Sequence, residues 1–441
     1  MAKAMSEVLK IALTQERLDV GSPEERACFG MLRFISRDSD LISGVDHYAN
    51  GYRPGPLSSG HALGEWLAWN WWRLSWEPRS DSKDWLLAHN LTAVGEGYAW
   101  PNLTIQSDGL RAVLNCRPSA RVDAKPFRYL GAPAAIIPLV KLQTAIDDFQ
   151  AQLLARLRER GIGDGNLFRL WSDVLAERSD PETAKRRKLE ALLGRDPDGV
   201  SDDELQRMVH DEDSLGASAV EELAADTGNA QATLSSDALI ELAQRVGQSA
   251  RPADAVRLRD VNGLAFDADA PPWRIGYEAA KRLRVQENLG DAPIRDATLA
   301  GMAGVVDNAI SDNPGDAPPL AFALDQTDAA GRVVFRSRYR TGRRFDLARL
   351  IGDRAIVGGS DNLRVATRSG TYRQKVQRAF AAEFLSPFEA VEASLSGDYS
   401  TETREDAARR FDVSERTIDT LLVNHRRLSR DDFDAEYTPA A

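Results

Sequence analysis

Two segments near the carboxyl end of this 441-residue chain constrain its fold most. The first, TGRRFDLARLIGDRAI, starts at Thr341, and the second, RQKVQRAFAAEFLSP, ends at Pro387. Both are predicted to form helices, and the residues between them suffice for about one strand and a turn. The rest of the chain is interpreted as a scaffold around this pair of helices.

The second segment ends in FAAEFLSP, from Phe380 to Pro387. This ending resembles the FAAELLMP-like helix ending of the ImmA/IrrE family of bacterial zinc peptidases. In that family a preceding helix reads roughly F-x-L-A-H-E-x-G-H, where two histidines one turn apart bind zinc and the glutamate polarises a water. The resemblance extends over residues 271–430, a little over a third of the chain, and implies a zincin-like α/β domain there.

The stretch from Phe345 to Asp353 keeps the frame of the family's zinc helix but changes its chemistry. Arg349 stands at the first histidine position, Leu350 at the glutamate position and Asp353 at the second histidine position. A guanidinium is always charged and does not ligate zinc, and a leucine cannot act as a general base. The resemblance therefore implies that the fold is kept and the peptidase activity is lost.

The third zinc ligand of the family, a glutamate on the second helix, is also missing. No carboxylate occurs between Ser369 and Glu383. We therefore expect no bound metal, no other cofactor and no enzymatic activity. The residues predicted to line this degenerate cleft are Arg349, Leu350, Asp353, Gln374 and Gln377.

Arg349 and Asp353 lie four residues apart, so their side chains are expected on the same helix face. In one interpretation they form an ion pair that fills the place of zinc, and its loss would cost about 3 kcal/mol if the pair is buried. In the other, the cleft binds an anionic group or a peptide carboxylate through Arg349, and Asp353 only orients it.

Composition narrows the classes of function that remain. A formal net charge of −11 argues against a protein that coats nucleic acid without sequence preference. Cys28 and Cys116 set no disulfide framework, which fits a reducing cytoplasm. Since no stretch approaches the apolar length of a membrane helix, we expect a cytoplasmic protein without a membrane partner.

Residues 1–161 are predicted to form a domain of short antiparallel strands, closed by a long helix from about Leu139 to a stop at Gly161. The stretch from Gly60 to Pro78 carries tryptophans on several faces of a predicted helix. A stacking platform for nucleic acid would need basic residues among the aromatic ones, and this helix offers only Arg73. A core helix is therefore favoured.

Residues 162–250 are predicted to form a helical module, and residues 271–430 the peptidase-like domain. In the helical module, the run from Lys185 to Lys188 is interpreted as a solvated helix face rather than a nucleic-acid patch. The expected fold class is α+β: a β-rich amino-terminal domain with a tryptophan-rich helix, the helical module, and the zincin-like domain with a terminal helix pair.

The segment from Thr403 to Leu428 has the rhythm of a helix-turn-helix, with its turn at Asp412 to Ser414. A DNA-binding interpretation directs four side chains of the second helix toward the bases, namely Glu415, Arg416, Asp419 and Asn424. Acids are about as numerous as bases here, however, and phosphate anchoring needs a positive surplus. A structural helix pair is therefore favoured.

The five histidines are too far apart in sequence for any two to show metal-ligand spacing, which argues against zinc. Another candidate contact for a partner or a nucleic acid is the group His47, Tyr48 and Arg53, which precedes the tryptophan-rich helix and could line a cleft in the first domain.

Three functions remain open on this basis. The first is a non-catalytic, peptidase-like regulatory protein that binds a protein partner. By analogy with the family, its setting would be bacterial stress, mobile elements or phage defence, and its partner a repressor, a toxin or a defence-complex subunit. The second is a DNA-binding regulator that uses residues 403–430. The third and weakest is a metallopeptidase with relocated ligands.

Overall fold

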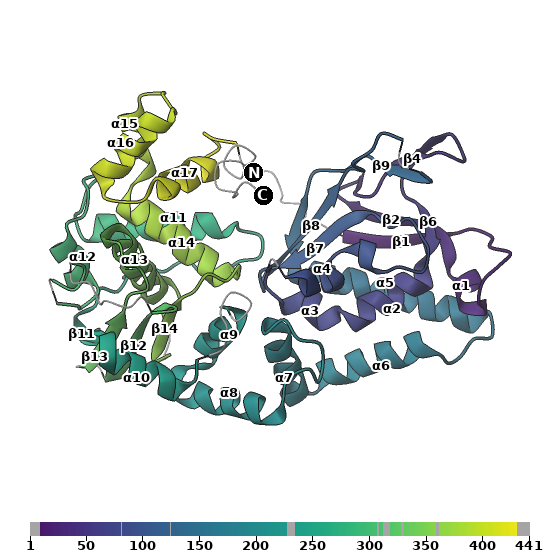
Figure 1. The fold of residues 1–441 in the computed structure, drawn as a ribbon, viewed down its shortest axis with the longest axis horizontal. Helices are drawn as coiled ribbons and strands as arrows, with labels where there is room; N and C mark the ends of the chain where they lie inside the picture. Colours follow the sequence, from purple (N-terminus) through teal and green to yellow (C-terminus); the bar gives the residue numbers. More distant parts are fainter. Residues whose placement is uncertain are drawn as a thin grey trace. The chain divides into compact units, whose positions relative to one another are not determined.

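The computed structural model describes residues 9–80, 82–123, 125–226, 234–306, 308–311, 318–327, 330–358 and 361–429. The remaining residues of the predicted domains, including 1–8, 227–233, 312–317 and 430, lie outside the described residues. The chain divides into two compact units, unit 1 (Met1–Leu205) and unit 2 (Gln206–Ala441). Each combines helices with antiparallel strands (Figure 1), which confirms the expected α+β class.

The described part of unit 1 contains three antiparallel sheets. Their strand orders are β1-β2-β3 with β6 beside β2, β10-β8-β7, and β5-β4-β9. The strands are β1 (Leu9–Gln15), β2 (Phe29–Ser36), β3 (Ser39–Asp40), β4 (Gly44–Asp46), β5 (Gly51–Arg53), β6 (Leu57–Ser59), β7 (Asn102–Ser107), β8 (Arg111–Arg117), β9 (Phe127–Tyr129) and β10 (Ala135–Pro138).

One apolar core fills unit 1, where the long helix α5 packs on β1, β8 and β10. The apolar residues of α5 recur at helical spacing and are buried as a stripe, which explains this docking. The helices are α1 (Pro23–Ala27), α2 (Gly60–Trp69), α3 (Trp71–Trp76), α4 (Lys83–His89), η1 (Leu91–Ala93, a 3-10 turn), α5 (Leu139–Glu159), α6 (Asn166–Ser179) and α7 (Pro181–Leu192).

The tryptophan-rich stretch forms two helices, α2 and α3, rather than one. They meet at Asn70, whose side-chain amide donates to the Trp66 carbonyl at 2.8 Å. A side chain that competes for a helical carbonyl favours a helix boundary. Trp71 and Trp72 then lie in the core, as expected for core helices, while Trp69 is 56% exposed.

Helices α6 and α7 belong to unit 1, because α6 packs on α2 and α7 packs on α3. Helix α8 (Asp202–Leu215) spans the boundary between the units, and α9 (Ala217–Asp226) and α10 (Ser236–Val246) belong to unit 2. The helices predicted as a module over residues 162–250 are thus divided between two units. Tryptophans of α3 contact both of the first two helices of this module: Trp72 donates to Glu177 of α6 at 2.7 Å, and Lys188 of α7 lies over the Trp76 ring.

Unit 2 contains one antiparallel sheet of order β11-β13-β12-β14 among its described residues. Helices α11, α13 and α14 lie on one side of it, and α10 lies on the other (Figure 1). Its remaining elements are β11 (Gln248–Ala250), η3 (Pro252–Asp254), α11 (Pro272–Gln286), α12 (Asp296–Met302), β12 (Ala321–Thr327), β13 (Ala330–Val334), α13 (Arg340–Ile356), β14 (Leu363–Ala366), α14 (Tyr372–Leu385), α15 (Phe388–Leu395), α16 (Thr401–Phe411) and α17 (Glu415–Asn424).

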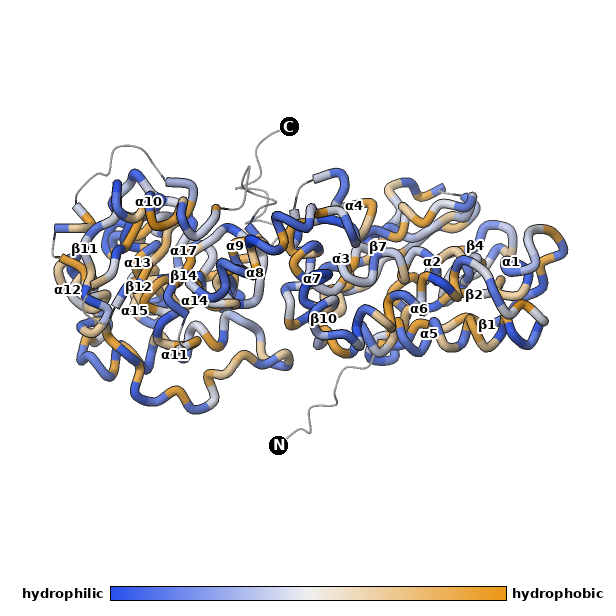
Figure 2. The backbone as a smooth tube through the Cα atoms, turned by 90° about the horizontal axis from the view of Figure 1, so that it is seen from below, coloured by the Kyte–Doolittle hydropathy of each residue, from blue (hydrophilic) through white to orange (hydrophobic). Residues whose placement is uncertain are grey.

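Helix α14 occupies the centre of the helical side of unit 2, in contact with α11, α13 and α17. Two glycines allow this close approach. A Cβ at Gly276 of α11 would lie 2.6 Å from backbone atoms of α14, and one at Gly352 of α13 would lie 2.4 Å from the Phe380 ring. Hydrophobic residues gather along α13 and β12 (Figure 2), which form part of the core. The two segments singled out from the sequence are therefore neighbours in space.

Candidate functional site

The facing sides of α13 and α14 bring together most of the residues predicted to line a cleft. Thr371 caps α14 by accepting from the Gln374 backbone at 3.3 Å, which fixes the start of this helix beside β14. We call the group Arg349, Asp353, Arg373, Gln374 and Gln377 the arginine cleft. None of these side chains is accessible, because each residue is at most 6% exposed.

Asp353 pairs with Arg373 across the two helices. Arg373 donates from Nε to Oδ1 at 2.7 Å and from Nη2 to Oδ2 at 2.6 Å, and Gln377 donates to Oδ1 at 2.8 Å. Burial alone would raise the pKa of Asp353, but the charge and hydrogen bonds of Arg373 outweigh it and hold the pKa below its usual range. The interpretation in which Arg349 pairs with Asp353 is therefore wrong: a bidentate pair between two helices takes the place of a contact along one helix.

Arg349 makes its contacts with neutral acceptors. Its Nη2 donates to the Thr367 carbonyl at 2.7 Å, to Gln374 Oε1, and to Gln377 Oε1 at 3.4 Å. Its buried Nε has no acceptor among the described residues. Burial, with a further contribution from nearby Arg378, lowers the pKa of Arg349 to about 9. The guanidinium is thus still charged at neutral pH but incompletely paired.

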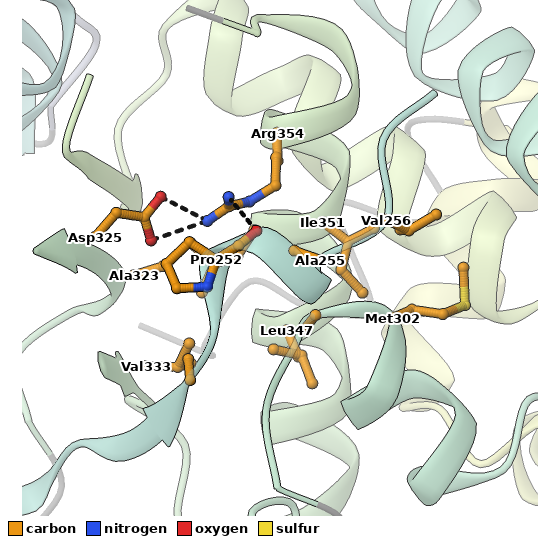
Figure 3. Close-up of a pocket in the computed structure, with 13 residues that line it drawn as sticks. Pro252, Ala255, Val256, Met302, Ala323, Asp325, Val333, Leu347, Ile351 and Arg354 are labelled. Carbon is orange, nitrogen blue, oxygen red and sulfur yellow. Dashed lines mark hydrogen bonds and ion pairs between the residues drawn. The ribbon is translucent and has the colours of Figure 1, made fainter. Parts of the chain in front are cut away.

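Leu350 faces away from the arginine cleft and lines a small cavity instead. The cavity is bordered by apolar residues and by Arg354, which donates to Asp325 at 2.7 and 3.0 Å (Figure 3). Its free volume is about 20 Å³, room for about one water. The structure therefore separates the position expected for a general base from the two positions expected for zinc ligands.

Helix α9 supplies a set of contacts to the arginine cleft that the sequence did not indicate. Thr371 donates to Glu222 Oε2 at 2.8 Å, Arg373 Nη1 donates to Ser218 Oγ at 2.7 Å, and the Arg368 amide donates to Asp226 Oδ1 at 2.9 Å. Each contact joins residues more than 140 positions apart. No local sequence pattern predicts contacts over such a distance. The only signal in the sequence was a charged residue, Arg373, on the face of α14 that is buried, because a buried charge requires a partner.

The terminal helices α16 and α17 form a pair with a left-handed residue, Asp412, at the turn (φ 60°). Arg416 is exposed and Asn424 is half-buried. Asp419 is only 1% exposed and pairs with Arg404 of α16, so the prediction that it points toward DNA bases is wrong. Its buried partner holds it inside the helix pair.

His47, Tyr48 and Arg53 lie on the hairpin of β4 and β5 in unit 1. Asp46 organises the tip: its Oδ1 accepts from the Tyr48 and Ala49 amides at 2.9 Å each, and its Oδ2 lies 3.0 Å from Arg53 Nε. Tyr48 is 89% exposed. The hairpin therefore presents Tyr48 to solvent, while Arg53 holds the tip together.

Comparison with known proteins finds no relative for this chain: no protein-family model, no curated protein and no solved structure matches it. In the part of the chain that the structure describes, no group of three or more histidine, cysteine, aspartate or glutamate residues is placed to hold a metal. Among the described helices, none is both long enough and apolar enough to cross a bilayer. The arginine cleft and the exposed hairpin and helix pair are thus the features on which a function can be argued.

Proposed function

We propose that this chain is a non-catalytic, peptidase-like protein that acts by binding a protein partner. The observation that carries the proposal is the bidentate pair of Arg373 with Asp353, at the position expected for the second zinc-binding histidine. A buried carboxylate whose two oxygens both accept from one arginine, and whose Oδ1 also accepts from Gln377, already has its charge paired inside the fold. Arg349 occupies the first ligand position in the same buried cluster.

Resemblance to the zinc peptidases supports the setting of this function rather than its chemistry. The proposed setting is bacterial stress, mobile elements or phage defence, and the proposed partner is a repressor, a toxin or a defence-complex subunit. The experiment is elemental analysis of protein expressed with added zinc, combined with incubation of the protein with candidate repressors. We expect no stoichiometric zinc and no cleavage; one zinc per chain with cleavage would refute the proposal.

A repair variant sharpens this test. Arg349→His, Leu350→Glu and Asp353→His together restore the family's helix motif. We expect the triple variant to stay inactive, because Gln374 and Gln377 provide no carboxylate as third ligand. We also expect it to be less stable, because Arg373 loses its buried partner.

A second candidate function is DNA binding through α16 and α17. The observation that favours it is the short turn between the helices, in which Asp412 adopts the left-handed conformation and Arg416 follows on the exposed side of α17. Fluorescence anisotropy with duplex DNA at several salt concentrations tests it. A DNA-binding protein should lose affinity as salt rises and on Arg416→Ala, whereas equal, weak binding under all conditions would exclude this function.

A further inference from the structure

Helix α9 places two carboxylates against the arginine cleft, and both come from outside α13 and α14. Glu222 is 7% exposed and accepts from Thr371, the residue that caps α14. Asp226 is 8% exposed and accepts from the Arg368 amide just before that cap. The positive end of the α14 dipole favours an anion at this place.

Without α9, the arginines in and around the cleft outnumber the carboxylates that α13 provides. Arg336 and Arg378 border it and interact electrostatically with Arg349. Against these arginines and Arg373, helix α13 contributes only two carboxylates, Asp346 and Asp353. The two carboxyl groups of α9 lie beside these arginines and offset part of their charge, although burial raises the pKa of Glu222.

With α9 in place, one hydrogen-bond donor of the arginine cleft, Arg349 Nε, still has no acceptor among the described residues. This nitrogen cannot reach water either, because Arg349 is only 2% exposed. A buried donor left without an acceptor costs about 1 to 3 kcal/mol. An anionic segment with a carboxylate in reach of this nitrogen would therefore bind more favourably than α9 at this point.

The apolar side of α9 is anchored separately from the core. Its buried apolar residues do not belong to the core cluster that joins α11, α13 and α14, and the helix contacts the edge strand β14. These residues are Ala219, Val220, Leu223, Ala224 and Ala225. Most are small, so the apolar area that holds α9 is modest and its polar contacts carry much of its attachment.

We propose that the arginine cleft is a binding site for an acidic helical segment of a partner protein, and that α9 is the internal segment that fills the site until the partner displaces it. This inference rests on the proposed function, for which it names the kind of partner. The exchange conserves charge, because one pair of carboxylates replaces another at the start of α14, beside the same arginines. The alternative is that α9 is a permanent part of unit 2.

The test uses the full chain and two synthetic peptides. One peptide has the sequence of α9, ASAVEELAAD, and the other, the amide peptide, has the sequence ASAVEQLAAN, in which amides replace the carboxylates of Glu222 and Asp226. Both are fluorescently labelled and followed by anisotropy. The protein variant Glu222→Gln/Asp226→Asn removes the two charges from α9 itself. Its matched control is Asp237→Asn/Glu241→Gln, which removes two charges from exposed positions of α10.

We expect the α9 variant to bind the acidic peptide at least about tenfold more tightly than the wild type or the α10 control, because its internal competitor has lost two charge-assisted hydrogen bonds. The amide peptide should bind weakly to all three proteins. Equal affinity of the variant and the wild type for the acidic peptide, or equal binding of both peptides by the variant, would overturn the inference.

A second measurement needs no variant and covers the case in which the substitutions unfold the protein. Hydrogen exchange of wild-type residues 217–226 should rise when the acidic peptide is added at roughly 1 mM, the range in which a tethered segment is outcompeted. Unchanged exchange there would also overturn the inference. Failure of the proposed function would instead show as stoichiometric zinc with peptidase activity, so the two failures are distinguishable.

Discussion

Each unit buries an arginine against a carboxylate, and the two clusters differ in where the partners come from. In unit 1, Arg73 and Glu77 lie one turn apart at the end of the same helix, and Arg73 Nε donates to Glu77 Oε2 at 2.7 Å. His89 Nε2 lies 2.9 Å from the same oxygen. In unit 2, Arg373 and Asp353 lie on different helices, and α9 adds carboxylates from a third.

The cluster of unit 1 is complete. His89 Nδ1 lies 2.8 Å from the Ile105 carbonyl, so this nitrogen donates, and Nε2 donates to the ionised Glu77. Arg73 also reaches Asp196 at 3.0 Å. No atom of Arg73, Glu77 or His89 is left buried without a partner, whereas Arg349 Nε is. The contrast favours a structural role for the cluster of unit 1. For the arginine cleft of unit 2, it favours the proposed exchange of α9 for a segment of a partner.

Asp353→Asn should give the largest change that this comparison predicts. The amide would turn one donor toward Arg373, which cannot release its proton, so the unfolding free energy of unit 2 should fall by about 3 to 5 kcal/mol. Denaturant unfolding followed by far-UV circular dichroism measures this. A loss below about 1 kcal/mol would mean that the pair is solvated rather than buried.

Glu77→Gln should cost less, about 1 to 3 kcal/mol, because the unit 1 cluster can adjust. The oxygen of the new amide can still accept from His89 Nε2, and Arg73 keeps Asp196. Unfolding of unit 1 can be followed by tryptophan fluorescence, since only Trp273 of the nine tryptophans lies after residue 205. A cost equal to that of Asp353→Asn would remove the distinction between the clusters.

Glu383 extends the comparison to a buried carboxyl with no arginine bound to it. Its Oε2 accepts from the Phe388 amide at 3.1 Å, and its Oε1 has no partner among the described residues. Burial raises the pKa of Glu383 to about 8, above the usual 4.5. The folded state therefore binds the extra proton between these values, so stability is full below about pH 4.5 and falls as pH rises toward 8.

Glu383→Gln should remove this pH dependence. At pH 8 we expect the variant to be more stable than the wild type by about 1 to 2 kcal/mol, because the amide keeps the bond to Phe388 without a buried charge. At pH 5 the two proteins should be nearly equal. Thermal unfolding at both pH values measures this, and a variant that is equally destabilised at pH 5 and pH 8 would contradict it.

Tyr48→Ala should have the smallest effect on stability, within about 0.5 kcal/mol, since the side chain is 89% exposed. It tests whether partner binding involves the hairpin of unit 1 or only the arginine cleft. If the peptide affinities of Glu222→Gln/Asp226→Asn are unchanged by adding Tyr48→Ala, the two surfaces are independent. A changed peptide affinity would contradict this independence.

Some elements were predictable because their signals are local. The periodic apolar residues of α5, its stop near Gly161, and the positions of α13 and α14 follow from nearby sequence. The break at Asn70 and the division of the predicted helical module between two units were not anticipated. The break depends on the Asn70 side chain and the division depends on the tertiary contacts of α6 and α7, and helical periodicity specifies neither.

By itself, the sequence determined that the two positions expected for zinc-binding histidines hold Arg349 and Asp353, on one face of one helix. Only the tertiary structure decided which partners these charges take. Arg373 lies across from Asp353 and can bind both of its oxygens, whereas Arg349 is left with carbonyl and amide acceptors. Residues four apart on a helix are near each other in any fold, but a buried charge is paired by whichever group the packing of other elements brings to it.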